Sequence, residues 1–289
     1  MIKNRNGDII VTNQKQNRLL EKLYNTVSGR MILKVITVPV ISKTAGRFMD
    51  SPLSIPMIKS FIKNHNLDTS QYAMKNFRSY NEFFTRKIKP EKRPVDYKAD
   101  HLISPCDSKL SVYRINRKSI FKIKDSLYRI SDLLDNNFIA RRYYGGYCFI
   151  YRLEVDDYHR YCYIDDGIKT ENIFIKGELH TVNPIALQRY NIYKRNSREY
   201  TIMHTDNFGD VVHIEIGALM VGKICNHHGE YNFVKGEEKG MFQFGGSTIV
   251  QLFEKDRICP DADILRNTRN GFETVVHYGE KTGNALKVI

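Results

Sequence analysis

The sequence predicts an α+β protein in which a helical amino-terminal region precedes a mostly antiparallel, β-rich domain. Before residue 95 the apolar residues recur at a helical period, whereas after it they form short strand-like runs separated by glycine-bearing turns. The 289 residues, 42% of them hydrophobic, are enough for one large domain or a domain with an appendage. We therefore expect a helical region at residues 1–95 and a β-rich domain at residues 96–289.

The amino-terminal region is expected to form amphipathic helices that lie at a membrane surface. One predicted helix has an apolar face made of Leu19, Leu20, Leu23, Tyr24 and Val27. The apolar run 31–41 follows, but it contains a lysine and a proline and is shorter than the ~20 residues that span a bilayer. Basic residues scattered through this region favour contact with anionic lipid. Packing of these helices on the catalytic domain or on a partner chain is an equally good interpretation.

Charge and cysteine usage limit the class of protein. Lys and Arg exceed Asp and Glu by 13, which favours an anionic membrane surface, an acidic substrate or nucleic acid as partner. The basic residues are dispersed and no nucleic-acid-binding module is recognisable, so we expect no nucleic-acid partner. The five cysteines show no Cys-x-x-Cys spacing, and the amino terminus lacks the apolar core of a signal peptide. These features indicate a reducing, cytoplasmic compartment.

The β-rich domain is predicted from strand-like runs at residues 147–153, 211–216 and 248–253. The last run follows the turn Gly245-Gly246-Ser247-Thr248. Because glycine adopts conformations that other residues resist, a strained turn here would present the Gly246 carbonyl to the Ser247 hydroxyl. Attack by that hydroxyl would make a cofactor from the protein itself. The alternative is a glycine-containing β-bulge at which Thr248 merely begins a strand.

Two further segments hold candidate catalytic groups. His159 is the best candidate for a general base, because imidazole takes and returns a proton near neutrality. A histidine satisfied by local hydrogen bonds is the alternative. Asp107 follows a proline turn, from which its carboxylate would orient the histidine, although an Asp in a turn is commonly only a turn former. We expect no metal site, since a zinc site at 225–228 would need a fourth ligand that we cannot identify.

Together these segments resemble the phosphatidylserine decarboxylase family, pyruvoyl-dependent membrane enzymes that make phosphatidylethanolamine. The resemblance extends through most of the chain. Each motif is weakly specific, but all of them occur in the family's order and end with the Gly-Ser-Thr turn, before which the family has Leu or Gly. The other motifs lie at residues 80–86, 93–95, 104–107, 157–160, 181–184, 196–198, 221–224 and 235–240.

The resemblance implies that the chain cuts itself between Gly246 and Ser247. Ser247 Oγ would attack the Gly246 carbonyl, and an N-to-O acyl shift would give an ester. Elimination would leave a dehydroalanine that tautomerises and hydrolyses with loss of ammonia. The products would be a β chain, residues 1–246, and an α chain, residues 247–289, headed by a pyruvoyl group. This group would form a Schiff base with the substrate amine and accept the electron pair released as CO₂ leaves.

The resemblance also implies partners and site residues. The substrate would be phosphatidylserine in an anionic membrane, met at the cytoplasmic face of the cell membrane by a peripheral enzyme. The α and β chains would stay associated, and a homo-oligomer is compatible with the family. Asp107 would orient the catalytic histidine, and Thr181 would contact the substrate head group. Ser247 and His159 would complete the catalytic set.

One position departs from the family pattern, which has a second histidine three residues after the first. This sequence has Cys162 there. In the family the second histidine is associated with serine activation and the first with decarboxylation. We hypothesise that His159 serves both steps, with Cys162 or a histidine from elsewhere in the chain as the alternative base. Two other functions fit less well: an uncleaved serine hydrolase that uses Ser247, and a catalytically silent membrane-surface binding protein of the same fold.

Overall fold

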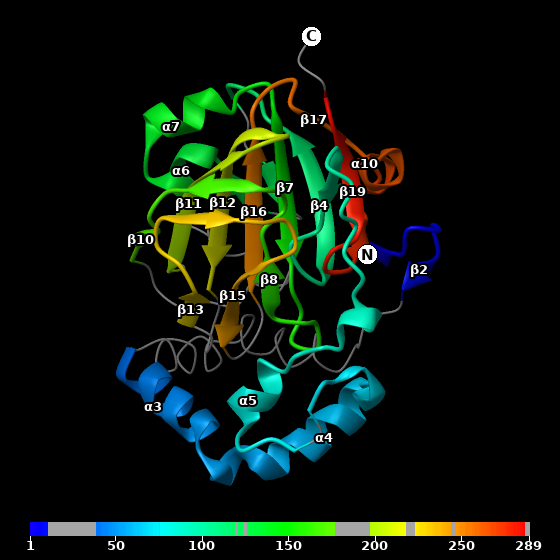
Figure 1. Ribbon diagram of the computed structural model, residues 1–289, viewed down its shortest axis with the longest axis vertical. Helices are drawn as coiled ribbons and strands as arrows, with labels where there is room; N and C mark the ends of the chain where they lie inside the picture. Colours follow the sequence, from blue (N-terminus) through cyan, green and yellow to red (C-terminus); the bar gives the residue numbers. More distant parts are fainter. Residues whose placement is uncertain are drawn as a thin grey trace.

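A computed structural model of the chain is shown in Figure 1. It describes residues 1–10, 39–74, 76–118, 121–123, 126–176, 197–217, 223–243 and 247–286. The predicted helix around residues 19–27, the first part of the apolar run, and the site residues Thr181 and Gly246 lie outside the described residues.

The core of the protein is one large sheet with the order β14-β9-β11-β12-β16-β7-β4-β18-β1-β2, and β10 pairs with β11 beside this path. Its strands are β14 (Tyr231–Phe233), β9 (Gly167–Lys169), β11 (Arg198–Thr205), β12 (Gly209–Ile216), β16 (Thr248–Phe253), β7 (Tyr147–Arg152), β4 (Ser108–Arg114), β18 (Glu273–Val276), β1 (Ile2–Lys3), β2 (Ile9–Ile10) and β10 (Ile173–Ile175). Neighbouring strands are antiparallel except for β1 and β18, which are parallel. The predicted mostly antiparallel β core is therefore confirmed.

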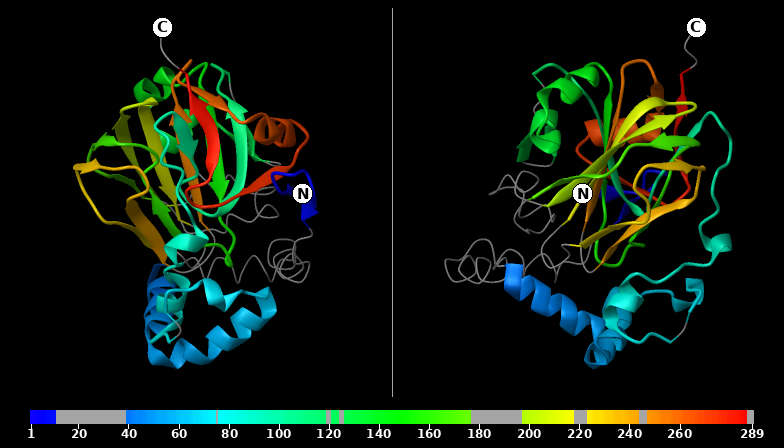
Figure 2. Two further views of the ribbon diagram at one scale, coloured as in Figure 1. Left: turned by 45° about the vertical axis from the view of Figure 1, so that its right-hand side comes forward. Right: turned by 60° about the vertical axis from the view of Figure 1, so that its left-hand side comes forward.

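Three smaller sheets complete the β-rich part (Figure 2). One has the order β13 (Lys223–Asn226), β15 (Glu238–Gln243) and β8 (Arg160–Cys162). A second has the order β17 (Ile258–Pro260), β19 (Lys281–Ala285) and β3 (His101–Ile103). The third pairs β5 (Phe121–Ile123) with β6 (Ser126–Tyr128). Helix α10 (Ala262–Arg269) lies beside β4, where the Thr268 hydroxyl accepts a hydrogen bond from Val112 N at 3.1 Å.

Both faces of the main sheet are covered, which explains why its central strand, β16, is buried along its whole length. On one face, Val250 and Leu252 pack with residues of the short helices α6 (Ile130–Leu134) and α7 (Asn137–Arg142). On the other, Ile249 and Phe253 pack with apolar residues of β8 and β15. We call this second side the inner face. Because strand side chains alternate, every other residue of a strand points to it.

Helices dominate the described part of the chain between residues 39 and 92. They are α3 (Pro39–Asp50), η1 (Pro52–Ser54), α4 (Ile55–His65), η2 (Thr69–Gln71), α5 (Tyr80–Phe84) and η3 (Pro90–Lys92). Their own small core contains Met49, Ile58 and Phe83, and they lie at one end of the β-rich part (Figure 1). Residues 1–10 belong instead to the sheet through β1 and β2. The domain boundary near residue 95 stays a prediction.

Helix boundaries follow from local capping. Pro52 and Pro56 stand in the first turns of η1 and α4, where a missing N–H is tolerated. Asn66 ends α4 in the left-handed conformation at φ 49°. The Ser79 hydroxyl accepts a hydrogen bond from Glu82 N and so caps α5. Of the helices in the described part of the chain, none is long and apolar enough to cross a membrane.

Candidate active site

Ser247 immediately precedes β16, in the middle of the main sheet. Its carbonyl accepts a hydrogen bond from Leu153 N at 2.8 Å, so the ladder between β16 and β7 continues through it. The residue is completely buried. Because Ser247 lies two residues before Ile249, the alternation of the strand directs its side chain toward the inner face. The candidate nucleophile is therefore enclosed and has a fixed backbone.

His159 lies just before β8 and is also completely buried. Its Nδ1 is 2.9 Å from the carbonyl oxygen of Asp157. A carbonyl only accepts, so Nδ1 carries the proton and the neutral ring has its basic lone pair on Nε2. The ring also contacts Phe84 of α5, with centroids 4.0 Å apart. These two contacts fix the orientation of the imidazole, as a proton acceptor requires.

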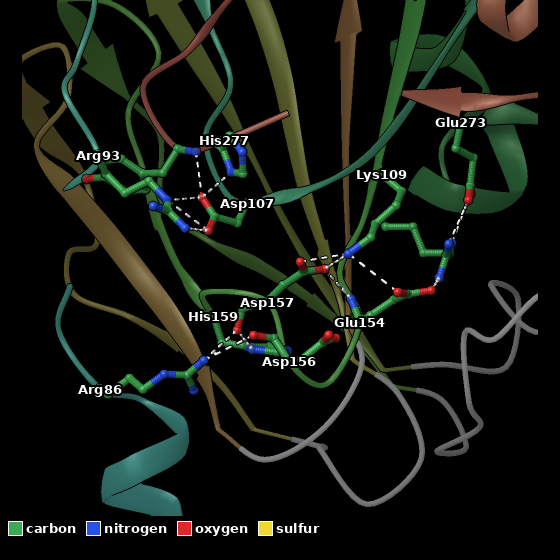
Figure 3. Close-up of polar contacts among 12 residues, drawn as sticks. Arg86, Arg93, Asp107, Lys109, Glu154, Asp156, Asp157, His159, Glu273 and His277 are labelled. Atoms are coloured by element: carbon green, nitrogen blue, oxygen red, sulfur yellow. Dashed lines mark hydrogen bonds and ion pairs between the residues drawn. The ribbon is translucent and has the colours of Figure 1, made fainter. Parts of the chain in front are cut away.

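His159 and Ser247 belong to the same end of the fold. The carbonyl of His159 accepts a hydrogen bond from Phe242 N at 2.9 Å, next to the end of β15. Only residues 244–246 separate that end from Ser247. Arg86, which follows α5, also contacts the loop that precedes His159. Its guanidinium donates a hydrogen bond to the Asp156 carbonyl at 3.1 Å (Figure 3).

The carboxylate of Asp107 has several partners. Arg93 binds its carboxylate through Nε at 2.8 Å and Nη2 at 2.6 Å, and Tyr278 N donates at 2.8 Å. His277 Nδ1 forms an ion pair at 3.7 Å (Figure 3). The Nδ1 contact of His159 is made by the Asp157 carbonyl, and the role of Asp107 in orienting His159 stays a prediction. The turn pattern at Asp107 does not predict these partners, because Arg93 lies 14 residues before it and His277 lies far along the chain.

The surroundings of Asp107 also fix its charge. Burial by itself would raise the pKa of this carboxyl, but His277 and Arg93 outweigh burial and lower the pKa to about 2. The same contact raises the pKa of His277 above its ordinary value. Both shifts favour the ionic form of the Asp107–His277 pair.

Cys162, which stands where the family has its second histidine, is a poor base here. The residue is completely buried, and its backbone N–H donates to the Pro105 carbonyl at 2.9 Å. Burial raises the pKa of the thiol to about 12. The thiol is therefore protonated at neutral pH, which favours His159 over Cys162 as the base.

An ionic network lies beside this site (Figure 3). Lys109 Nζ contacts both carboxylate oxygens of Asp157 at 2.7 Å, and Asp157 also accepts from Glu154 N at 2.7 Å. Arg152 binds Glu154 at 2.8 Å and Glu273 at 2.6 Å. Thr248 pairs with Arg152, which in turn pairs with Lys109, so the network occupies the strand positions next to Ser247. It holds the loop whose carbonyl orients His159.

Comparison with known proteins shows which family the chain is similar to. A family model described as phosphatidylserine decarboxylase matches residues 80–284. The chain is 47% identical over 277 residues to phosphatidylserine decarboxylase proenzyme 2 of Clostridium acetobutylicum, covering 96% of this chain and 95% of that one. It is 43% identical over 276 residues to the phosphatidylserine decarboxylase proenzyme of Ruminiclostridium cellulolyticum, covering 93% and 92%.

The site and the similar proteins together define the class of the protein. A buried serine lies at the head of a central strand, and the chain matches phosphatidylserine decarboxylase proenzymes along nearly its whole length. The protein is therefore a decarboxylase made as a precursor. The chain belongs to the phosphatidylserine decarboxylase family.

Proposed function

We propose that the protein converts phosphatidylserine to phosphatidylethanolamine and CO₂ after cutting itself between Gly246 and Ser247. The observation that carries the proposal is the position of Ser247. It is a completely buried serine with a fixed carbonyl at the start of β16, in a chain whose relatives are named proenzymes. If Ser247 served only to begin a strand, there would be no reason for its relatives to be made as proenzymes.

In the proposed self-cleavage, His159 takes the proton of Ser247 Oγ as the hydroxyl attacks the Gly246 carbonyl. The Asp157 carbonyl and the Phe84 ring hold the imidazole in the tautomer that this step needs. The Lys109–Asp157 contact fixes the loop that supplies the carbonyl. The Asp107–Arg93 pair positions the neighbouring loop. The contact of Thr181 with the head group remains a proposal, since this residue lies outside the described ones.

The cofactor in this proposal is a pyruvoyl group at residue 247. Such a group supplies a carbonyl that accepts the electron pair left when CO₂ departs. The residues present fit it. Position 247 is completely buried, and its carbonyl is held by Leu153 N, so the protein fixes the orientation of the group and limits the access of water.

The two chains of the mature protein are proposed to stay together. β16 and β18, from the α chain, lie between strands of the β chain, with β16 placed between β12 and β7. The buried Arg152–Glu273 ion pair also joins the two chains. Separation would break two full ladders of hydrogen bonds in the middle of the sheet.

Access to phospholipid is proposed to come from a membrane-facing surface on α3, η1 and α4. Phe48 is 43% exposed and Leu53 77% exposed, and both are accompanied by exposed Met57. Lys59 and Lys63 are exposed on the same helical segment. Apolar side chains flanked by basic ones suit the interface of an anionic membrane. We propose peripheral attachment at the cytoplasmic face of the cell membrane; a homo-oligomer is also proposed.

The test is the intact mass of the purified protein under denaturing conditions, together with CO₂ release from phosphatidylserine vesicles. We expect two chains divided after Gly246, with a pyruvoyl group in place of the serine at the head of the smaller one, and we expect turnover. The matched control is Ser247→Ala, which should remain a single chain without turnover. A wild-type chain that stays intact and releases no CO₂ would contradict the proposal.

A further inference from the structure

A polar cluster lies inside the protein between the main sheet and the smaller β13-β15-β8 sheet. It consists of His213 and Glu215 on β12, Gln251 on β16 and Lys239 on β15, and all four are completely buried. We call these residues the inner polar cluster. His213 and Glu215 alternate with apolar residues that pack on the other face, so both point to the inner face. Ser247 points to the same face.

The cluster is connected by hydrogen bonds. Lys239 Nζ contacts Glu215 Oε1 and donates to Asn226 Oδ1 at 2.7 Å. Gln251 Nε2 donates to His213 Nδ1 at 3.1 Å. With Nδ1 accepting, the proton of the neutral imidazole is on Nε2. Burial lowers the pKa of His213 well below its ordinary value, so the ring is neutral.

Three polar atoms of the cluster have no hydrogen-bond partner within the described residues. They are His213 Nε2, Glu215 Oε2 and Gln251 Oε1. His213 Nε2 lies 3.4 Å from Glu215 Oε1 but without the geometry of a hydrogen bond. A buried polar atom without a partner is unfavourable, because it has lost its hydrogen bonds to water without replacement. These three atoms come from neighbouring positions, since His213 pairs with Gln251 across the two strands.

The three atoms comprise one donor and two acceptors, which is what a single water molecule satisfies. Its oxygen accepts from His213 Nε2, and its two hydrogens go to Glu215 Oε2 and Gln251 Oε1. A phospholipid head group is too large for residues that are completely buried. The one donor and two acceptors of this buried cluster therefore suit a small neutral molecule that forms hydrogen bonds.

The cluster is close to the residue that is processed. Glu215 pairs with Ile249, and Ser247 is two residues before Ile249 on the same face. Diagonal neighbours of this kind are roughly 7–8 Å apart in an antiparallel pair. A glutamate side chain and one water molecule span that distance. Ser247 is itself completely buried, so any water that reacts there must be held inside the protein.

We propose that the inner polar cluster holds the water molecule that hydrolyses residue 247 during maturation, with Glu215 as the base. This inference rests on the proposed function, because it assigns the last step of self-processing. After elimination, residue 247 is an imine, CH₃–C(=NH)–. The water oxygen bonds to the imine carbon as Glu215 accepts one water proton and returns it to nitrogen. The second water proton follows to nitrogen, the C–N bond breaks, a ketone forms and ammonia leaves.

The test uses Glu215→Gln in the full-length chain, made by cell-free synthesis and sampled over time. Samples are quenched with cyanoborohydride, which reduces an imine to an amine, so that an unhydrolysed residue 247 is detected by mass as an alanyl group. We expect cleavage after Gly246 to proceed while hydrolysis slows by about 10²-fold, the lower range for loss of a positioned acid–base group. The matched control is Asn267→Leu, a buried polar residue that bonds Thr274 on a distant strand.

Gln251→Met is the second variant, because it keeps the shape of the side chain and leaves the Lys239–Glu215 pair intact. We expect the same accumulation of imine from it. If Glu215→Gln does not fold or is not cleaved, the accumulation of imine in Gln251→Met tests the proposed water site instead. Cleaved variants that become fully pyruvoyl-headed at the rate of the control would overturn the water site while leaving the proposed function standing. A wild-type chain that is never cleaved would overturn the proposed function itself.

Discussion

The buried ion pair between Arg152 and Glu273 gives a prediction whose size follows from the structure. Arg152 donates to both Glu273 oxygens, at 2.9 and 2.6 Å, and the side chains are only 4% and 8% exposed. Removal of one partner of a buried pair typically costs about 3–5 kcal/mol, because the other charge remains in a poorly solvated place. Arg152 keeps its contact with Glu154, so Glu273→Ala should fall near the lower value, about 3 kcal/mol.

The assay is urea and thermal unfolding in a Ser247→Ala background, so that every sample is one uncleaved chain. A loss of about 3 kcal/mol should lower Tm by roughly 6 °C or more in a protein of this size. The surface pair Arg142–Asp210, with side chains 40% and 24% exposed, is the matched control. Asp210→Ala should change stability by less than about 1 kcal/mol.

A double variant separates pairing from packing. Arg152→Met with Glu273→Ala removes both charges, so its destabilisation should be clearly smaller than the sum of the single changes. Equal losses from Glu273→Ala and Asp210→Ala, or additive losses in the double variant, would refute the argument that an unpaired buried charge determines the effect.

Four further predictions can be checked directly. His159→Ala should slow self-cleavage by about 10²-fold or more, followed by intact mass; processing at the wild-type rate would exclude His159 as the base. Cys162→Ala should still cleave, because its thiol is protonated, and a chain that stays intact would contradict this. Asp107 has a folded pKa of about 2, below the ordinary 3.8, so its stabilisation is present above pH 3.8 and is lost as the pH falls toward 2. Urea unfolding across this pH range should show that the free energy of unfolding depends less on pH in Asp107→Asn than in the wild type. An unchanged pH dependence would contradict this prediction. Leu53→Glu should weaken sedimentation with anionic vesicles, whereas Phe138→Glu, 79% exposed on α7, should not; equal losses would place the lipid-binding surface elsewhere.

Much of the fold could be predicted from the sequence because strand signals are local. The predicted run 248–253 is β16, the run 147–153 contains β7, and the run 211–216 lies within β12. Their apolar composition follows from burial on both faces of the sheet, and the glycine-bearing turns mark their ends.

The polar partners could not be predicted in the same way. Lys239 and Glu215 appear in the sequence as single charged residues in strand-like runs, and only the packing of two sheets brings them together. Arg93 contacts Asp107 from 14 residues away, whereas His277 comes from a much later part of the chain. The parallel pairing of β1 with β18 likewise joins residues 2–3 to 273–274. Local periodicity carries no information about contacts between residues on different elements, so the partners of Asp107 could not be predicted from it.

The central position of β16 has a consequence for the order of events in biosynthesis. The strands on the two sides of β16 are β12 and β7, and their residues meet next to Ser247 only when β16 has entered the sheet. A chain cut before folding would have to recruit its central strand from solution. In the proposed self-cleavage, a misfolded precursor would not assemble the groups that cut it and would stay inactive. The proposal therefore implies that only molecules that have completed folding gain activity.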